Sequence, residues 1–119
     1  MKKTLVLGAT TNPERYAYRA VQRLLHHGHE VVPVGIRAGD IEGIPIQQGM
    51  PVVADLDTIS LYVGPANQKV YYDYLLSLQP KRIIFNPGTE NPELEALAQQ
   101  QNIDVVEGCT LVMLSIGVY

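Results

Sequence analysis

The residues best suited to bind a ligand form a short polar segment near the start of the chain, Gly8-Ala9-Thr10-Thr11-Asn12-Pro13. The segment follows the apolar run Thr4–Leu7 and precedes an amphipathic stretch, so it is expected to join a strand to a helix. Glycine lets a ligand approach the main chain, and the unpaired N–H groups at a helix start attract anions. Thr10 and Thr11 add hydroxyl groups, and Arg15 adds a positive charge in the first helical turn. The segment therefore predicts a site for a phosphorylated ligand.

This segment departs from the G-x-G-x-x-G pattern of dinucleotide-binding loops. Gly8 is present, but Thr10 and Pro13 occupy the positions of the second and third glycines. The second apolar run ends in Val34-Gly35-Ile36-Arg37, without the acidic residue that binds a ribose 2′-hydroxyl. The sequence thus disfavours NAD. Arg37 favours a ribose that carries its own phosphate, as in NADP or coenzyme A (CoA).

Strand-like and helix-like segments alternate along the chain. The predicted strands are Thr4–Leu7, Glu30–Val34, Ile59–Val63, Arg82–Phe85 and Ile103–Val106. The predicted helices are Pro13–His27, Pro65–Leu78 and Pro92–Gln101, with a short helical or irregular cover over Thr110–Ile116. This alternation implies parallel strands with helices packed on both faces. We expect one α/β domain over residues 1–119, with a Rossmann-like three-layer fold and a five-stranded, mainly parallel sheet.

Three prolines are expected to open the helices, in the segments Asn12-Pro13, Gly64-Pro65 and Asn91-Pro92. The two asparagines are suitable N-caps. In an open parallel sheet, ligands bind beyond the carboxyl ends of the strands. The loops expected at that edge are Gly8–Pro13, Gly35–Gly39, Gly64–Asn67 and Asn86–Glu90, and each contains glycine.

The composition restricts the class of partner. The formal net charge of −3 argues against a broad nucleic-acid footprint, which needs a basic face. The single cysteine, Cys109, excludes an intramolecular disulfide and fits a reducing compartment. The first apolar run breaks at Gly8, too early for a signal peptide, and no segment is long enough to span a membrane. We expect a cytoplasmic protein without membrane contact.

No residues are singled out as catalytic or metal-binding. His26, His27 and His29 lie at a predicted helix end, where their interaction with the helix dipole accounts for them. No carboxylate or cysteine lies near them at ligand spacing. Asp55 and Asp57 precede a predicted strand, and a solvated connector explains them better than acid–base chemistry.

Several of these segments together resemble a known family. They are Gly8-Ala9-Thr10-Thr11-Asn12-Pro13-Glu14-Arg15, Tyr18-Arg19, His27-Gly28-His29-Glu30-Val31, Gly43-Ile44-Pro45, Asn86-Pro87-Gly88 and Gly108-Cys109. The chain resembles the small stand-alone CoA-binding proteins, which are similar to the N-terminal CoA-binding domain of the succinyl-CoA synthetase α subunit. The resemblance implies a Rossmann-like fold that binds CoA. The first loop would hold the pyrophosphate and the loop after the second strand the adenosine phosphate.

The candidate cofactor-binding residues lie in these loops. They are Gly8, Ala9, Thr10, Thr11, Asn12, Pro13, Arg15, Arg37, Val63, Gly64, Pro65, Asn86, Pro87 and Gly88. Many family members have Asn-Pro-Lys after the second strand, whereas this chain has Gly35-Ile36-Arg37. The positive charge is kept, but the local turn is not.

Two functions follow from these observations. The first is a module that binds CoA or acyl-CoA and has no catalysis of its own, because the synthetase's phosphorylated histidine and nucleotide-activating machinery lie in further domains. The second is a component of an NADP- or other nucleotide-dependent enzyme that needs a partner subunit. Tyr72 and the apolar tail Leu111–Tyr119 are candidates for a homodimer contact.

Overall fold

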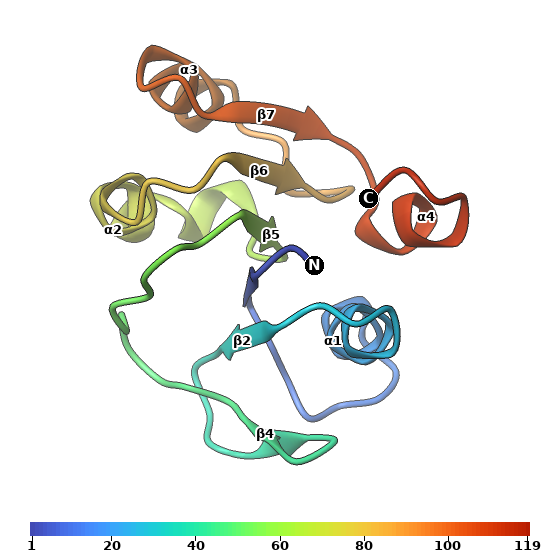
Figure 1. Ribbon diagram of the computed structural model, residues 1–119. Coiled ribbons are helices and arrows are strands. Elements are labelled where there is room, and N and C mark those ends of the chain that lie inside the picture. The colour runs from blue at the N-terminus through green and yellow to red at the C-terminus, as the bar shows by residue number, and fades with distance from the viewer.

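Five short strands form one parallel sheet in the computed structural model, which describes residues 1–119 (Figure 1). The strands are β1 (Thr4–Leu7), β2 (Val31–Val34), β5 (Thr58–Leu61), β6 (Arg82–Phe85) and β7 (Asp104–Glu107). Their order across the sheet is β2-β1-β5-β6-β7, and every neighbouring pair is parallel. β2 and β5 thus lie on opposite sides of β1, which creates a topological switch point. The Rossmann-like α/β prediction is confirmed, although some strand ends shift by one or two residues.

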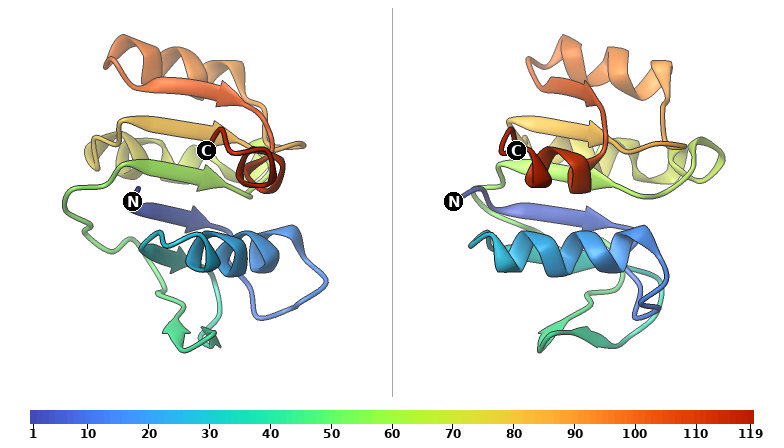
Figure 2. Two further views of the ribbon diagram at one scale, coloured as in Figure 1. Left: turned by 45° about the vertical axis from the view of Figure 1, so that its right-hand side comes forward. Right: turned by 90° about the vertical axis from the view of Figure 1, so that its right-hand side faces the viewer.

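Helices cover both faces of the sheet (Figures 1 and 2). Helices α1 (Tyr16–His26) and α4 (Thr110–Ser115) lie on one face, and α2 (Tyr72–Ser77) and α3 (Pro92–Gln100) lie on the other. Alternate strand residues point to opposite faces. Accordingly Leu5 and Leu7 belong to the apolar cluster beneath α2 and α3, whereas Val6 belongs to the cluster beneath α1 and α4. No helix combines the length and apolar character that a membrane span requires.

Helix α1 begins three residues later than the sequence predicts. The main-chain N–H of Glu14 donates to Asn12 Oδ1 (3.0 Å), and that of Arg15 donates to the Asn12 carbonyl oxygen (3.1 Å). Asn12 and Pro13 therefore form a turn before the helix. Arg15 occupies the N-cap position and makes no side-chain capping bond. The prediction that Asn12-Pro13 opens this helix directly is wrong.

The predicted second helix is also broken. It consists of two 3₁₀ turns, η1 (Pro65–Asn67) and η2 (Lys69–Tyr71), followed by α2. The Gln68 side chain between the two turns is fully buried and donates hydrogen bonds to neighbouring loops. These buried contacts, and not a regular helical pattern, determine the conformation of the segment. By contrast, Asn91 caps α3 as predicted, because its Oδ1 accepts from the N–H groups of Glu93 and Leu94.

A small hairpin lies between β2 and β5. It pairs β3 (Asp40–Ile41) with β4 (Ile44–Pro45) in antiparallel fashion. The two residues between the strands, Glu42 and Gly43, both have positive φ (49° and 83°), as a two-residue hairpin turn requires. Gln47 then forms a parallel bridge with Val34, so the segment partly covers the outer edge of β2.

Candidate functional site

A cleft with a volume of about 980 Å³ opens at the carboxyl ends of β1, β2 and β5. This is the switch point of the sheet, where open α/β folds place their ligands. The loops after all three strands line the cleft. It contains nine of the predicted binding residues: Gly8, Ala9, Thr10, Thr11, Asn12, Arg15, Arg37, Val63 and Gly64. The fold therefore brings together residues that lie up to 56 positions apart in the sequence (8 to 64).

Five of the predicted binding residues do not line the cleft: Pro13, Pro65, Asn86, Pro87 and Gly88. The Asn86 side chain is buried and fully engaged elsewhere. Its Nδ2 donates to Ser60 Oγ (3.0 Å) and to the Leu61 carbonyl oxygen (2.9 Å), and its Oδ1 accepts from the Thr110 N–H (2.8 Å). Asn86 thus joins β5 and β6 to the start of α4.

Other lining residues were not among the candidate binding residues named from the sequence, although some lie in the loops expected at this edge. They include Tyr16, Ile36, Tyr62, Ala66, Asn67, Val70 and Tyr71. Tyr16, Ile36 and Val70 are 66%, 81% and 73% exposed, which is unusual for large apolar or aromatic side chains. The broken segment after β5 brings Ala66, Val70 and Tyr71 to the cleft. A regular helix over this segment would predict that Tyr71 packs in the core, and it would not predict that Tyr71 also lines the cleft.

Glycines allow the first loop and the loop after β2 to pack against each other. A Cβ atom on Gly35 would overlap the Ala9 carbonyl oxygen, and one on Gly39 would overlap the Thr11 side chain. The N–H groups of Gly8 and Ala9 both donate to the Val34 carbonyl oxygen (2.9 Å each). These contacts fix the two loops as one continuous wall of the cleft.

The cleft is positively charged although the chain is not. Arg15 and Arg37 line it, and no aspartate or glutamate does. Neither arginine has a carboxylate within 4.0 Å; the ion pairs of the chain involve Lys3, His26 and Lys81. Thr10, Thr11 and Asn12 line the same cleft and add neutral polar side chains to the two arginines. Unpaired arginines with neutral donors form an environment that attracts a phosphate-bearing ligand.

A buried amide supports the wall formed after β5. Gln68 Nε2 donates to the carbonyl oxygens of Val63 and Thr89 (2.8 Å each), and Gln68 Oε1 accepts from Asn91 Nδ2 (2.9 Å). Asn91 Nδ2 also donates to the Tyr72 hydroxyl (2.7 Å). The network ties the cleft-lining Val63 to the loop after β6 and to the cap of α3.

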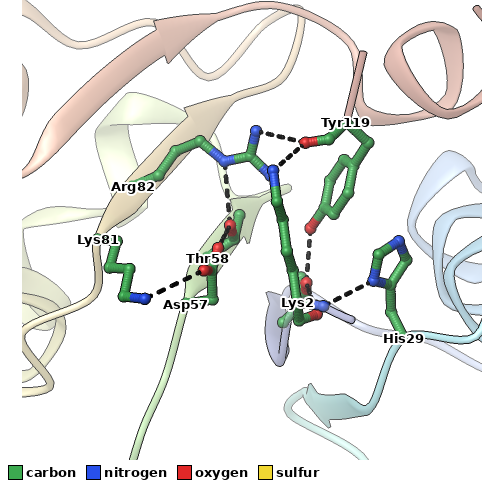
Figure 3. A network of polar contacts seen from close by, with 8 residues as sticks. Lys2, His29, Asp57, Thr58, Lys81, Arg82 and Tyr119 are labelled. Carbon is green, nitrogen blue, oxygen red and sulfur yellow. Dashed lines mark hydrogen bonds and ion pairs between the residues drawn. The ribbon is translucent and has the colours of Figure 1, made fainter. Parts of the chain in front are cut away.

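The opposite edge of the sheet is closed by a separate polar network (Figure 3). Lys2 Nζ and Arg82 Nη1 both donate to the Tyr119 carbonyl oxygen, and the Arg82 guanidinium stacks 4.4 Å from the centre of the Tyr119 ring. Arg82 Nε donates to Thr58 Oγ1 (3.0 Å). The Lys2 N–H donates to His29 Nδ1 (2.9 Å), and burial together with nearby positive charges lowers the pKa of His29. These contacts join the beginnings of β1, β2, β5 and β6 to the end of the chain.

The other two histidines form local contacts at the end of α1. His26 Nε2 lies 2.9 Å from Glu42 Oε1 in the hairpin, and His27 Nδ1 lies 2.7 Å from the Arg23 carbonyl oxygen.

The structure contains no cluster of three or more histidine, cysteine, aspartate or glutamate side chains that could hold a metal ion.

The comparison with family models decides the family. The model described as "CoA binding domain" matches residues 2–115, nearly the whole chain. This chain belongs to the CoA-binding domain family. No protein of curated function matches it.

Solved structures of similar proteins agree with the fold. The crystal structure of an uncharacterized protein is 55% identical, covers 100% of this chain and 98% of its own length, and superposes with a TM-score of 0.98. A hypothetical protein from Pyrococcus horikoshii OT3 is 26% identical over 97% of this chain and 82% of its own, with a TM-score of 0.84. A dinucleotide-forming acetyl-CoA synthetase from Ca. Korarchaeum cryptofilum has the same fold over 89% of this chain, which corresponds to 25% of that enzyme (20% identity, TM-score 0.67). The family's fold thus also occurs as part of a much longer chain.

Proposed function

We propose that this protein binds CoA or an acyl-CoA in the cleft at the switch point, and that residues 1–119 act as one CoA-binding domain with no catalytic residue of its own. The observation that carries the proposal is the charge of the cleft. The net charge of the chain is −3, but the cleft is lined by two unpaired arginines and by no carboxylate. Membership of the CoA-binding domain family supports the same ligand.

The ligand's phosphates would lie along the wall built by the first two loops. The N–H groups of Thr10 and Thr11, the two threonine hydroxyls and Arg15 would supply donors for the pyrophosphate. Arg37 follows β2 on the same wall and would contact the 3′-phosphate of the ribose. Val63 and Gly64 would contact the remainder of the ligand, and a Cβ on Gly64 would meet nothing within 4 Å, which leaves open space above it.

A thermal-shift panel tests this proposal. The ligands are CoA, 3′-dephospho-CoA, acetyl-CoA, NADP and NAD. A ligand at one hundred times its Kd stabilises the folded state by about 2.7 kcal/mol, so binding raises the melting temperature measurably. CoA and acetyl-CoA are expected to raise it and NAD is not. Stabilisation by NADP with none by CoA would support the alternative, a component of an NADP-dependent enzyme that needs a partner subunit.

We further propose a reducing, cytoplasmic setting and a homodimer, with CoA or acyl-CoA as the small-molecule partner and no role for nucleic acid. The outward side of α4 and the tail support a dimer contact, because Val112, Ile116 and Val118 are more than half exposed. Tyr72 is half-buried and bonds to Asn91, so it supports that contact less. Light scattering across a range of concentrations would give twice the monomer mass for a dimer. A constant monomer mass would exclude one.

A further inference from the structure

Three arginines form a line along the exposed side of α1. Arg15, Arg19 and Arg23 follow one another at intervals of four residues, which places neighbouring side chains on the same helix face. All three are exposed, and none has a carboxylate within 4.0 Å. Arg15 reaches the cleft, whereas Arg19 and Arg23 do not line it. We call these three residues the arginine stripe.

Two of the three arginines, Arg15 and Arg19, oppose the stability of their own helix. Like charges at four-residue spacing repel each other. Arg15 and Arg19 also lie near the positive end of the helix dipole, where acidic residues are favoured. The first turn of α1 contains no acidic residue, whereas the first turn of α3 contains Glu93 and Glu95. The helix dipole therefore accounts for Arg23, which lies in the last turn of α1, but not for Arg15 and Arg19, and this points to an interaction that explains those two.

The positive charge of the arginine stripe is local, because the rest of the molecule is negatively charged. The chain carries net charge −3, and acidic residues gather on α3 and β7, at the far end of the sheet from α1 (Figure 1). The stripe is one helix wide, and Glu14 and Glu42 lie beside its two ends in the structure. Nucleic acid requires a broader basic face than this. A narrow row of unpaired charges suits a partner equally narrow, such as one acidic helix or strand.

Tyr16 adds the apolar contact that protein interfaces use. Its side chain is 66% exposed at the start of the stripe, and the Arg19 guanidinium lies 5.6 Å from the centre of its ring. Tyrosine and arginine are both among the residue types enriched at the centres of protein interfaces. We propose that the arginine stripe, with Tyr16, docks an acidic segment of a partner protein whose carboxylates repeat at a similar spacing.

The test uses two labelled synthetic peptides of identical composition and fluorescence anisotropy with the full chain. One peptide is helical and carries glutamates four residues apart; the other carries the same glutamates side by side. The spaced peptide is expected to bind about threefold more tightly, and binding is expected to weaken as salt is raised. Equal binding of the two peptides, or no binding at low salt, would overturn the proposal.

Charge reversal identifies the binding surface. Arg19→Glu with Arg23→Glu is expected to weaken the spaced peptide about tenfold. Lys69→Glu with Lys81→Glu is the matched control, because it changes net charge equally at exposed sites away from α1 and is expected to change binding less than twofold. Equal losses in the two double variants would contradict the stripe. So would tighter binding of a single-stranded oligonucleotide than of the peptide.

The stripe can be tested separately from the cleft. Arg19 and Arg23 do not line the cleft, so their double variant is expected to keep the CoA-induced thermal shift of the unmodified chain. That retained shift also shows that the variant is folded. If CoA stabilises neither protein, circular dichroism establishes folding instead, and the peptide result still decides the proposal.

Discussion

Arg37 is the residue that best separates the ligands the cleft can hold. It is exposed, unpaired and lies in the loop after β2, three residues beyond the end of that strand. Arg37→Ala is expected to weaken CoA about five- to tenfold, the effect of one exposed charge-assisted contact, and to leave 3′-dephospho-CoA unchanged. Calorimetric titration of both ligands measures the difference. Lys69→Ala, an exposed cation outside the cleft, is the control. If Arg37→Ala lowered the affinity for CoA and for 3′-dephospho-CoA equally, Arg37 would not contact the 3′-phosphate.

Gln68 is the residue whose buried polar contacts hold the wall after β5. Gln68→Ala leaves the Val63 and Thr89 carbonyl oxygens and the Asn91 amide without this partner. The free energy of unfolding is therefore expected to fall by about 3 kcal/mol, as measured by urea denaturation. Gln100→Ala, at an exposed position of α3, is expected to change it by less than about 0.5 kcal/mol. A similarly small change for Gln68→Ala would show that solvent replaces these bonds.

At the scale of elements, the shape of the cleft depends on the contact between the loop after β1 and the loop after β2. Gly35→Ala would place a Cβ atom against the Ala9 carbonyl oxygen and push the loop after β2 away from the first loop. We expect it to weaken CoA binding about tenfold or more and to lower the melting temperature. Gly64→Ala, where an added Cβ meets nothing within 4 Å, is the stability control. Unchanged CoA affinity in Gly35→Ala would show that the joined wall is not required.

The beginnings of β1 and β2 are coupled through the Lys2 N–H and the His29 ring. Burial, followed by nearby positive charges, lowers the pKa of His29 from its ordinary value of 6.5. The unfolded chain therefore binds this proton more readily than the folded chain, so stability is highest above pH 6.5 and falls as the pH drops below it. His29→Gln is expected to flatten this fall in urea denaturation measured from pH 8 to pH 5, about the range in which histidine titrates. An identical pH profile in the variant would exclude His29 as the cause.

Elements could be predicted from the sequence where local patterns and tertiary contacts agree. The five predicted strands and the Asn91 cap rest on local signals, and each appears in the structure. The segment after β5 is different, because burial of Gln68 overrides the regular helical pattern. Asn12 also misleads, since an asparagine that caps a turn and one that caps a helix look alike in the sequence.

At the scale of the whole molecule, the order of the strands explains which site residues could be predicted. Alternating strands and helices predict that the loops after the strands share one edge, and the cleft confirms this for the loops after β1, β2 and β5. The pattern does not show which of those loops adjoin the switch point. β6 lies beyond β5, so the loop starting at Asn86 falls outside the cleft, and its asparagine serves α4 instead.

The distribution of charge is the other property of the whole molecule. A net charge of −3 is compatible with an anionic ligand because the acidic side chains stay out of the cleft and two arginines remain unpaired within it. Composition alone cannot reveal such a separation, since it depends on which residues folding brings together. An anionic ligand would therefore be held by the local positive charge of the cleft despite the negative net charge of the protein.

Calorimetric titration of the full chain with CoA tests the central claim most directly. We predict saturable binding at one CoA per chain, weakened at least about tenfold when Arg15 and Arg37 are both replaced by alanine, because both unpaired charges of the cleft are then lost. Absence of saturable binding by CoA, together with saturable binding by NADP, would contradict the account.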